Sequence, residues 1–119
     1  SMCNSSIEVW KKYKEYNEYE ISNLGNVRTL KYGKIDILKP NITRGYNRVK
    51  LRIDGKNKDF YVHRMVAEMF IPNPNNLPQI DHINTIRTDN RVENLRWCTA
   101  KENANNPLTL NKRKKYNYS

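Results

Sequence analysis

The chain has 119 residues and a mass of 14.2 kDa, which suits one small domain or a compact core with an appendage. It carries 22 Lys and Arg against 12 Asp and Glu, a net charge of +10. A charge this high on so small a protein favours an anionic partner, and nucleic acid is the usual one. We expect no signal peptide and no membrane span, because no apolar run approaches the ~20 residues that a span requires.

The two cysteines, Cys3 and Cys98, exclude a disulfide scaffold and a four-thiolate zinc site. His63 and His82 do not complete a Cys2His2 site with them, because the CxxC and HxxxH spacings are missing. Cys98 lies in an apolar stretch and is expected to be buried and inert. We therefore expect no zinc.

The N-terminal half has the alternation and the turn residues of antiparallel strands. Residues 19–22 and 27–30 predict a hairpin, with Gly25 free to take a positive φ in the turn. Residues 35–38 predict a further strand.

A longer hairpin follows, because residues 46–53 alternate and Asp54-Gly55 is a strong turn signal before a returning strand at 59–63. Apolar side chains occupy one face of its first strand and basic side chains the other: Val49, Leu51 and Ile53 against Arg48, Lys50 and Arg52. The first half is therefore predicted to be one small antiparallel sheet with a basic face.

In the second half the period changes at residues 64–70, where Met65, Val66, Met69 and Phe70 share a helical stripe typical of a core helix. Residues 79–83 and 94–98 predict two short strands around a polar loop at 84–93. Thr99 and Glu102 form a capping box, so a helix that carries Asn103 and Asn106 on one side is expected to begin there.

Three polar side chains of this strand–loop–strand–helix segment suit phosphodiester hydrolysis. Asp81 and Asn103 offer the hard oxygen ligands that Mg²⁺ or Mn²⁺ prefers. His82 is a base suited to neutral pH. An Asp-His pair taken alone is more typical of a turn, so the pair needs its surroundings to indicate catalysis.

Those surroundings carry a family resemblance over roughly residues 8–106. The second half closely resembles the HNH endonuclease family, with the phage homing endonucleases of group I introns as the most similar branch. The stretches that carry it are 63–74, 80–83, 89–97 and 102–103. Trp10 with residues 19–28 resembles the short DNA-binding module that often precedes such nucleases.

The resemblance implies an α+β protein, a small antiparallel β-sheet module followed by a ββα-metal nuclease unit. It implies His82 as the general base and one Mg²⁺ or Mn²⁺ ion held by Asp81 and Asn103. It also implies that Asn94 braces the loop and orients the base, although an Asn before Leu-Arg-Trp also suits a structural loop cap.

The expected partner is double-stranded DNA, bound by a monomer. The exposed strand face fits a major groove, although a merely solvated face explains it too. Arg96 is a phosphate contact or else a partner of Glu93. The side chains expected to contact DNA are Arg28, Arg44, Arg48, Lys50, Arg52, Arg64, Arg87, Arg91 and Arg96.

The sequence thus predicts a DNA-binding module at 1–62, a nuclease domain at 63–107 and a mobile basic tail at 108–119. We expect a metal-dependent DNA endonuclease in the cytoplasm of a bacterial host or a phage-infected cell. The alternative is a DNA-binding regulator that keeps the scaffold without cutting. Metal-dependent cleavage of a plasmid separates the two.

Overall fold

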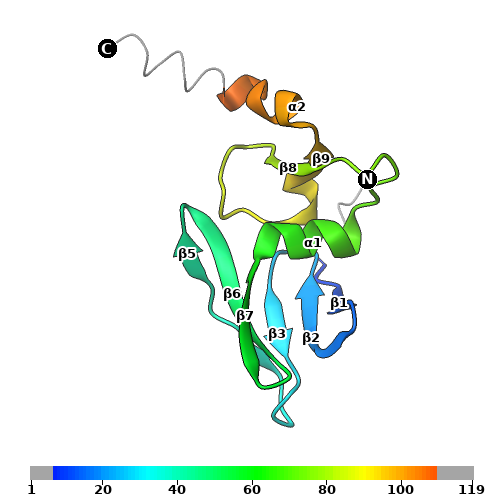
Figure 1. Cartoon of the computed structure of the whole chain (residues 1–119), viewed down its shortest axis with the longest axis vertical. Helices are drawn as coiled ribbons and strands as arrows, with labels where there is room; N and C mark the ends of the chain where they lie inside the picture. The colour runs from blue at the N-terminus through cyan, green and yellow to red at the C-terminus, as the bar shows by residue number, and fades with distance from the viewer. Residues whose placement is uncertain (1–6, 110–119) are drawn as a thin grey trace.

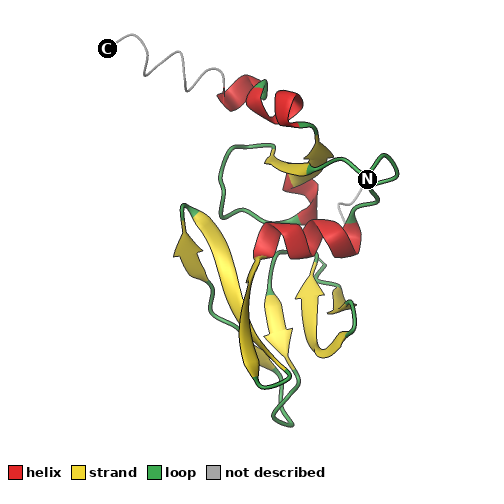
Figure 2. Ribbon diagram, in the orientation of Figure 1, coloured by secondary structure: helices red, strands yellow, loops and turns green. Residues whose placement is uncertain are grey.

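The computed structural model describes residues 7–109, and it is an α+β protein as the sequence predicts (Figures 1 and 2). Its strands form three separate antiparallel sheets, and a single helix in the middle of the chain lies among them. The basic tail predicted at residues 112–115 and Cys3 lie outside the described residues.

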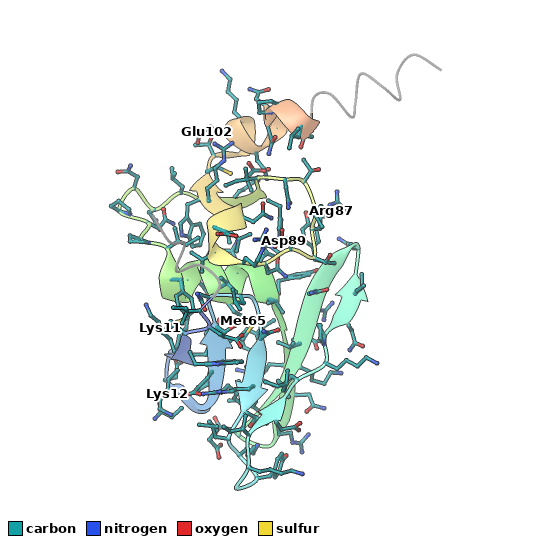
Figure 3. The ribbon with its side chains drawn as sticks, turned by 180° about the vertical axis from the view of Figure 1, so that it is seen from behind. Lys11, Lys12, Met65, Arg87, Asp89 and Glu102 are labelled. Atoms are coloured by element: carbon teal, nitrogen blue, oxygen red, sulfur yellow. The ribbon has the colours of Figure 1, made fainter. Side chains whose placement is uncertain are left out.

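The first sheet joins four strands in chain order: β1 (Trp10–Tyr13), β2 (Tyr16–Ser22), β3 (Val27–Thr29) and β4 (Asp36–Ile37). The predicted hairpin is confirmed, since β2 and β3 pair around a turn in which Gly25 has φ of 88°. Tyr19, Ile21 and Val27 face the core and are buried. The sequence analysis missed β1, whose Lys11 and Lys12 project outward (Figure 3).

The second sheet contains β5 (Asn41–Thr43), β6 (Tyr46–Ile53) and β7 (Lys56–Tyr61). The alternation on β6 is confirmed, because Val49 and Leu51 are buried while Lys50 and Arg52 are exposed. The prediction of one sheet in the first half is wrong, because β4 and β5 end up in different sheets. Both sheets turn their apolar faces toward the same helix.

That helix, α1 (Val62–Phe70), begins two residues earlier than predicted, and the returning strand ends at Tyr61. The sequence of this first turn, Val-His-Arg-Met, does not show where the strand period of β7 ends and the helical period begins. Val62, Met65, Val66 and Ala67 are at most 1% exposed. The helix contacts strands of all three sheets, and Met65 points into the layer between them (Figure 3).

The remaining elements form a strand–loop–strand–helix unit on the other side of α1 (Figure 1). The unit comprises β8 (Gln79–His82), the 3-10 turn η2 (Val92–Asn94), β9 (Leu95–Cys98) and α2 (Ala100–Ala104). The predicted capping box is confirmed, since Thr99 Oγ1 accepts from Glu102 N at 3.1 Å and Glu102 Oε1 accepts from Thr99 N at 2.9 Å. Asn106 lies beyond the end of α2, not within it as expected.

Over residues 7–109, no helix is long and apolar enough to cross a membrane. Cys98 is buried, as expected, and burial raises the pKa of its thiol. A buried thiol held in its neutral form is a poor nucleophile and a poor metal ligand.

Leu51→Ala tests the shared core. Leu51 is fully buried on β6, so we expect the free energy of unfolding to fall by about 2–5 kcal/mol. Ile42→Ala is the control, because Ile42 is 68% exposed and its loss should change stability by less than about 0.5 kcal/mol. Urea unfolding monitored by circular dichroism measures both, and equal effects would contradict the described packing.

Candidate active site

Strand β8 brings two adjacent polar side chains into the interior of the protein. Asp81 is 3% exposed and His82 is 6% exposed, although neighbours on a strand point to opposite sides. Strand β9 covers them from one side, with Asp81 opposite Arg96 and His82 opposite Leu95 in the register. Burying two polar side chains requires partners for each, and the structure provides them.

The predicted trio meets in one open cleft of about 500 Å³, lined by Asp81, His82 and Asn103 together with Tyr46 and Arg87. Asp81 and His82 come from β8, and Asn103 comes from the one full turn of α2 that the capping box fixes. Residues 21 positions apart in sequence therefore face the same space. This juxtaposition depends on the β8–β9 hairpin, which returns the chain to the start of the unit.

The Asp81 carboxylate is held by two side chains. Arg96 Nε donates to Oδ2 at 3.0 Å, and Asn106 Nδ2 donates to both carboxylate oxygens at 2.9 and 3.0 Å. Of the two alternatives for Arg96, pairing with Glu93 is wrong, because the cross-strand register places it against Asp81 instead. Glu93 accepts from Arg91.

Two features orient the His82 ring. Its Nε2 lies 2.8 Å from Asn90 Oδ1, a buried hydrogen bond, and the rings of Tyr46 and His63 lie 5.9 and 5.1 Å away. Burial lowers the pKa of His82, while the Asn90 hydrogen bond and the Asp81 charge oppose this shift in part. The net direction favours a neutral imidazole at neutral pH, as a proton acceptor requires.

Asn94 ties the polar loop to itself. Its Nδ2 donates to Asn84 Oδ1 at 2.9 Å and to the Asp89 carbonyl at 2.8 Å, and its Oδ1 accepts from Asn84 N at 3.0 Å. The side chain is 5% exposed and spans the loop between β8 and η2. This geometry fits both the bracing role and a structural loop cap, so the part of Asn94 in orienting the base stays a prediction.

His63, at the start of α1, is packed between Tyr46, Tyr61 and His82. Among the described residues, its Nδ1 is one of two buried side-chain atoms without a hydrogen-bond partner. Burial, reinforced by the positive charge that His82 and Arg64 contribute, lowers the pKa of His63 to about 4. His63 is therefore neutral at physiological pH.

Several of the arginines expected at DNA are engaged within the protein. Arg28 pairs with Glu20 at 2.7 Å and stacks on Trp10, and Arg48 pairs with Asp59 at 2.6 Å. Arg91 bonds both Asp89 and Glu93. The hydrogen bond from Arg91 lowers the pKa of Asp89 to about 2, so this pair keeps its charges over the physiological range. Whether these three contact DNA stays a prediction.

The other predicted cations are more open. Arg44, Lys50, Arg52 and Arg64 are exposed, and Arg64 stacks on Trp97. Arg87 connects the second sheet to the cleft, since its Nη1 donates to the Arg44 carbonyl at 3.1 Å and its guanidinium lies over Tyr46 (Figure 3).

Three residues of the site were missed in the sequence. Asn90, Asn106 and Tyr46 lie 8, 25 and 36 positions from the side chains that they contact, His82, Asp81 and His82 respectively. The only local signal was the abundance of Asn in the polar loop and after α2. Such residues are equally common in turns, so that signal does not separate structural from site asparagines.

Comparison with known proteins shows which families the chain matches. Residues 60–105 match the HNH endonuclease family, and residues 8–52 match the NUMOD4 motif. The chain therefore contains a region that matches the HNH endonuclease family. Asp81, His82, Asn94 and Asn103 all lie inside it, whereas β1 to β5 and most of β6 lie in the NUMOD4 match.

Relatives include viral and phage proteins. An uncharacterized HNH endonuclease of Acanthamoeba polyphaga mimivirus, L245, is 39% identical over 84% of this chain. The DNA endonuclease I-HmuI of Bacillus phage SP01 is 40% identical over 84% of this chain. A solved structure of I-HmuI, an HNH homing endonuclease described binding and cleaving DNA, matches with a TM-score of 0.75 over 87% of this chain.

The chain covers only part of each relative, namely 30% of L245, 58% of the I-HmuI sequence and 59% of the solved I-HmuI chain. The two family matches together contain Asp81, His82, Asn103 and most of the strands that precede them. The fold resemblance that the sequence indicated is therefore confirmed.

The low pKa of His63 predicts that the protein loses stability in acid. The unfolded chain binds a proton at His63 below about pH 6.5, whereas the folded protein does so only near pH 4. The contribution of His63 to the free energy of unfolding is therefore full above about pH 6.5 and falls as the pH drops toward 4. His63→Phe keeps a ring in the packing but cannot titrate, so we expect its stability to fall less than that of the wild type.

Urea unfolding at several pH values between 7.5 and 4.5 makes the comparison. His82, whose pKa is lowered as well, retains a share of the dependence in the variant. Parallel curves for the wild type and His63→Phe would contradict the assignment to His63.

Proposed function

We propose that this chain is a metal-dependent DNA endonuclease that hydrolyses phosphodiester bonds, acting as a monomer on double-stranded DNA. One observation carries the proposal. A buried carboxylate, a buried histidine and an amide side chain converge on one open cleft. The HNH match over residues 60–105 and the similarity to a DNA endonuclease support this reading.

The donor set fits one Mg²⁺ or Mn²⁺ ion. Asp81 contributes a carboxylate, and Asn103 contributes an amide oxygen because its Nδ2 donates to Gln79 at 3.0 Å. Within residues 7–109, no three His, Cys, Asp or Glu side chains cluster as a metal site, and the proposed ion takes one carboxylate and one amide ligand from the protein. A hard cation bound here with water and phosphate supplies Lewis-acid stabilisation of the charge that develops on the leaving oxygen.

The protein's own groups carry the proton chemistry. His82 accepts a proton from the attacking water, the new P–O bond forms and the bond to the leaving oxygen breaks. Burial keeps the imidazole neutral, and Tyr46 and Asn90 fix its plane. Arg96 balances the Asp81 charge from the neighbouring strand.

DNA reaches the cleft along the second sheet in this proposal. Lys50 and Arg52 project from the exposed face of β6, and Arg44 and Arg87 continue the positive surface to the cleft. The two longer strands of this three-stranded sheet, β6 and β7, resemble the two-stranded ribbon that fits a DNA major groove. The proposal keeps the predicted division into a DNA-binding module at 1–62 and a nuclease domain at 63–107, with the boundary one residue inside α1.

His82→Ala tests the base. We expect cleavage of supercoiled plasmid to slow by about 10²–10⁴-fold, with DNA affinity close to wild type, because general-base catalysis supplies about that factor.

Asp81→Ala should abolish Mg²⁺-dependent cutting, and Asn103→Ala should raise the Mg²⁺ concentration required. EDTA should stop the wild type. Agarose gels and a Mg²⁺ titration measure these effects, with Lys12→Ala as a surface control.

Wild-type cutting by His82→Ala would end the proposed mechanism. Wild-type protein that binds DNA but leaves the plasmid intact with both Mg²⁺ and Mn²⁺ would favour the alternative, a DNA-binding regulator on the same scaffold. The retained trio in one cleft favours the enzyme.

The binding surface is tested by salt. Each phosphate contact contributes a slope of about −0.9 in log K against log salt, so removing one contact flattens the dependence by roughly that amount. We expect Lys50→Ala and Arg52→Ala each to do so in fluorescence-anisotropy titrations on duplex DNA. Lys12→Ala removes the same charge from β1, a strand of the other sheet, and should leave the slope near wild type. Identical slopes for all three variants would contradict the proposed surface.

A further inference from the structure

Asn90 has a buried side-chain amide, and among the described residues only one of its two polar atoms has a hydrogen-bond partner. It is 3% exposed, and its Oδ1 lies 2.8 Å from His82 Nε2. Its Nδ2 is buried and, among the described residues, has no hydrogen-bond partner. A buried donor without a partner destabilises a fold, so the amide is not explained by stability alone.

The Asn90 hydrogen bond has a consequence for the His82 ring. A neutral imidazole carries one proton, and an oxygen acceptor at Nε2 requires that nitrogen to hold it. The lone pair then lies on Nδ1. An acceptor at Nε2 thus determines which ring nitrogen is able to take a proton from water.

The backbone around Asn90 is in turn supported by the first sheet. Gly25, in the β2–β3 turn, has φ of 88°, and a Cβ there would lie 3.0 Å from both Cβ and the carbonyl oxygen of Asn90. Two residues from the glycine, the Asn23 carbonyl accepts from Val92 N at 2.9 Å. The turn therefore packs on the polar loop on both sides of Arg91, and only a glycine fits at the closest point.

We propose that Asn90 is a positioning residue that sets the tautomer of His82, and that the Gly25 turn of the N-terminal module holds Asn90 in place. The module then acts on catalysis as well as on DNA. This inference rests on the proposed function only for its kinetic consequence, because the tautomer exists without metal, DNA or turnover.

The first experiment is ¹⁵N NMR of the histidine side chains in the full chain, without metal or DNA, at a pH where both rings are neutral. The chain has only two histidines, and His63→Phe assigns the signals. We expect His82 in the Nε2–H form in the wild type. Asn90→Asp keeps an oxygen acceptor and should keep that form, whereas Asn90→Leu, similar in volume, should lose it.

A wild-type ring in the Nδ1–H form, or an unchanged tautomer in Asn90→Leu, would overturn the proposal whatever the protein does to DNA. Where plasmid cleavage is observed, Asn90→Leu should lower kcat by about 10–100-fold with KM near wild type, the usual cost of losing an orienting partner. A fall in DNA affinity with an unchanged kcat would overturn the positioning role as well.

The glycines provide a matched control for the second half of the proposal. Gly33 and Gly55 have φ of 75° and 74° and nothing within 4 Å of an added Cβ, so alanine there introduces the same backbone strain without touching Asn90. We expect Gly25→Ala to disturb the His82 tautomer, and Gly33→Ala and Gly55→Ala to leave it intact while lowering the melting temperature. The same tautomer in all three variants would overturn the role of the turn.

Discussion

The packing of α1 against strands of all three sheets is the constraint on which the rest of the structure depends. Four of its nine residues are at most 1% exposed, and strands of three separate sheets contact it. Buried side chains of all three sheets join those of α1 in one hydrophobic cluster. The helix therefore serves as the common core, and it ties the strand–loop–strand–helix unit to the N-terminal sheets.

The position of the cleft follows from this arrangement. The β8–β9 hairpin packs on one side of α1 and the β6–β7 hairpin on another, so Tyr46 at the start of β6 reaches the His82 ring. The polar loop crosses between them and contacts the Arg44 carbonyl through Arg87. Residues 53–59 lie between the two family matches. The cleft is bounded by elements from both matches, one before and one after this gap.

Local rules predicted what local interactions determine. The capping box at Thr99, the alternation on β6 and the Asp54-Gly55 turn depend on neighbours a few residues away, and all are as expected. The division of the N-terminal strands into two sheets was not predictable in the same way, because strand alternation does not specify whether β4 and β5 pair. The Arg96–Asp81 pair depends on a register across a long loop, which no alternation pattern specifies.

The two proposed metal ligands lie on elements of different stability, because Asp81 belongs to strand β8 and Asn103 to the short helix α2. Helix α2 has five residues, fewer than the ~12–15 at which an isolated helix becomes marginally stable, and none of them is buried. The capping box and the bond between Asn103 and Gln79 contribute to its stability, together with its contacts to β8 and β9. Asp81 is fixed in a strand, whereas Asn103 lies on a segment that opens at low free-energy cost. If this one turn frays, an oxygen donor leaves the cleft while the core around α1 stays folded.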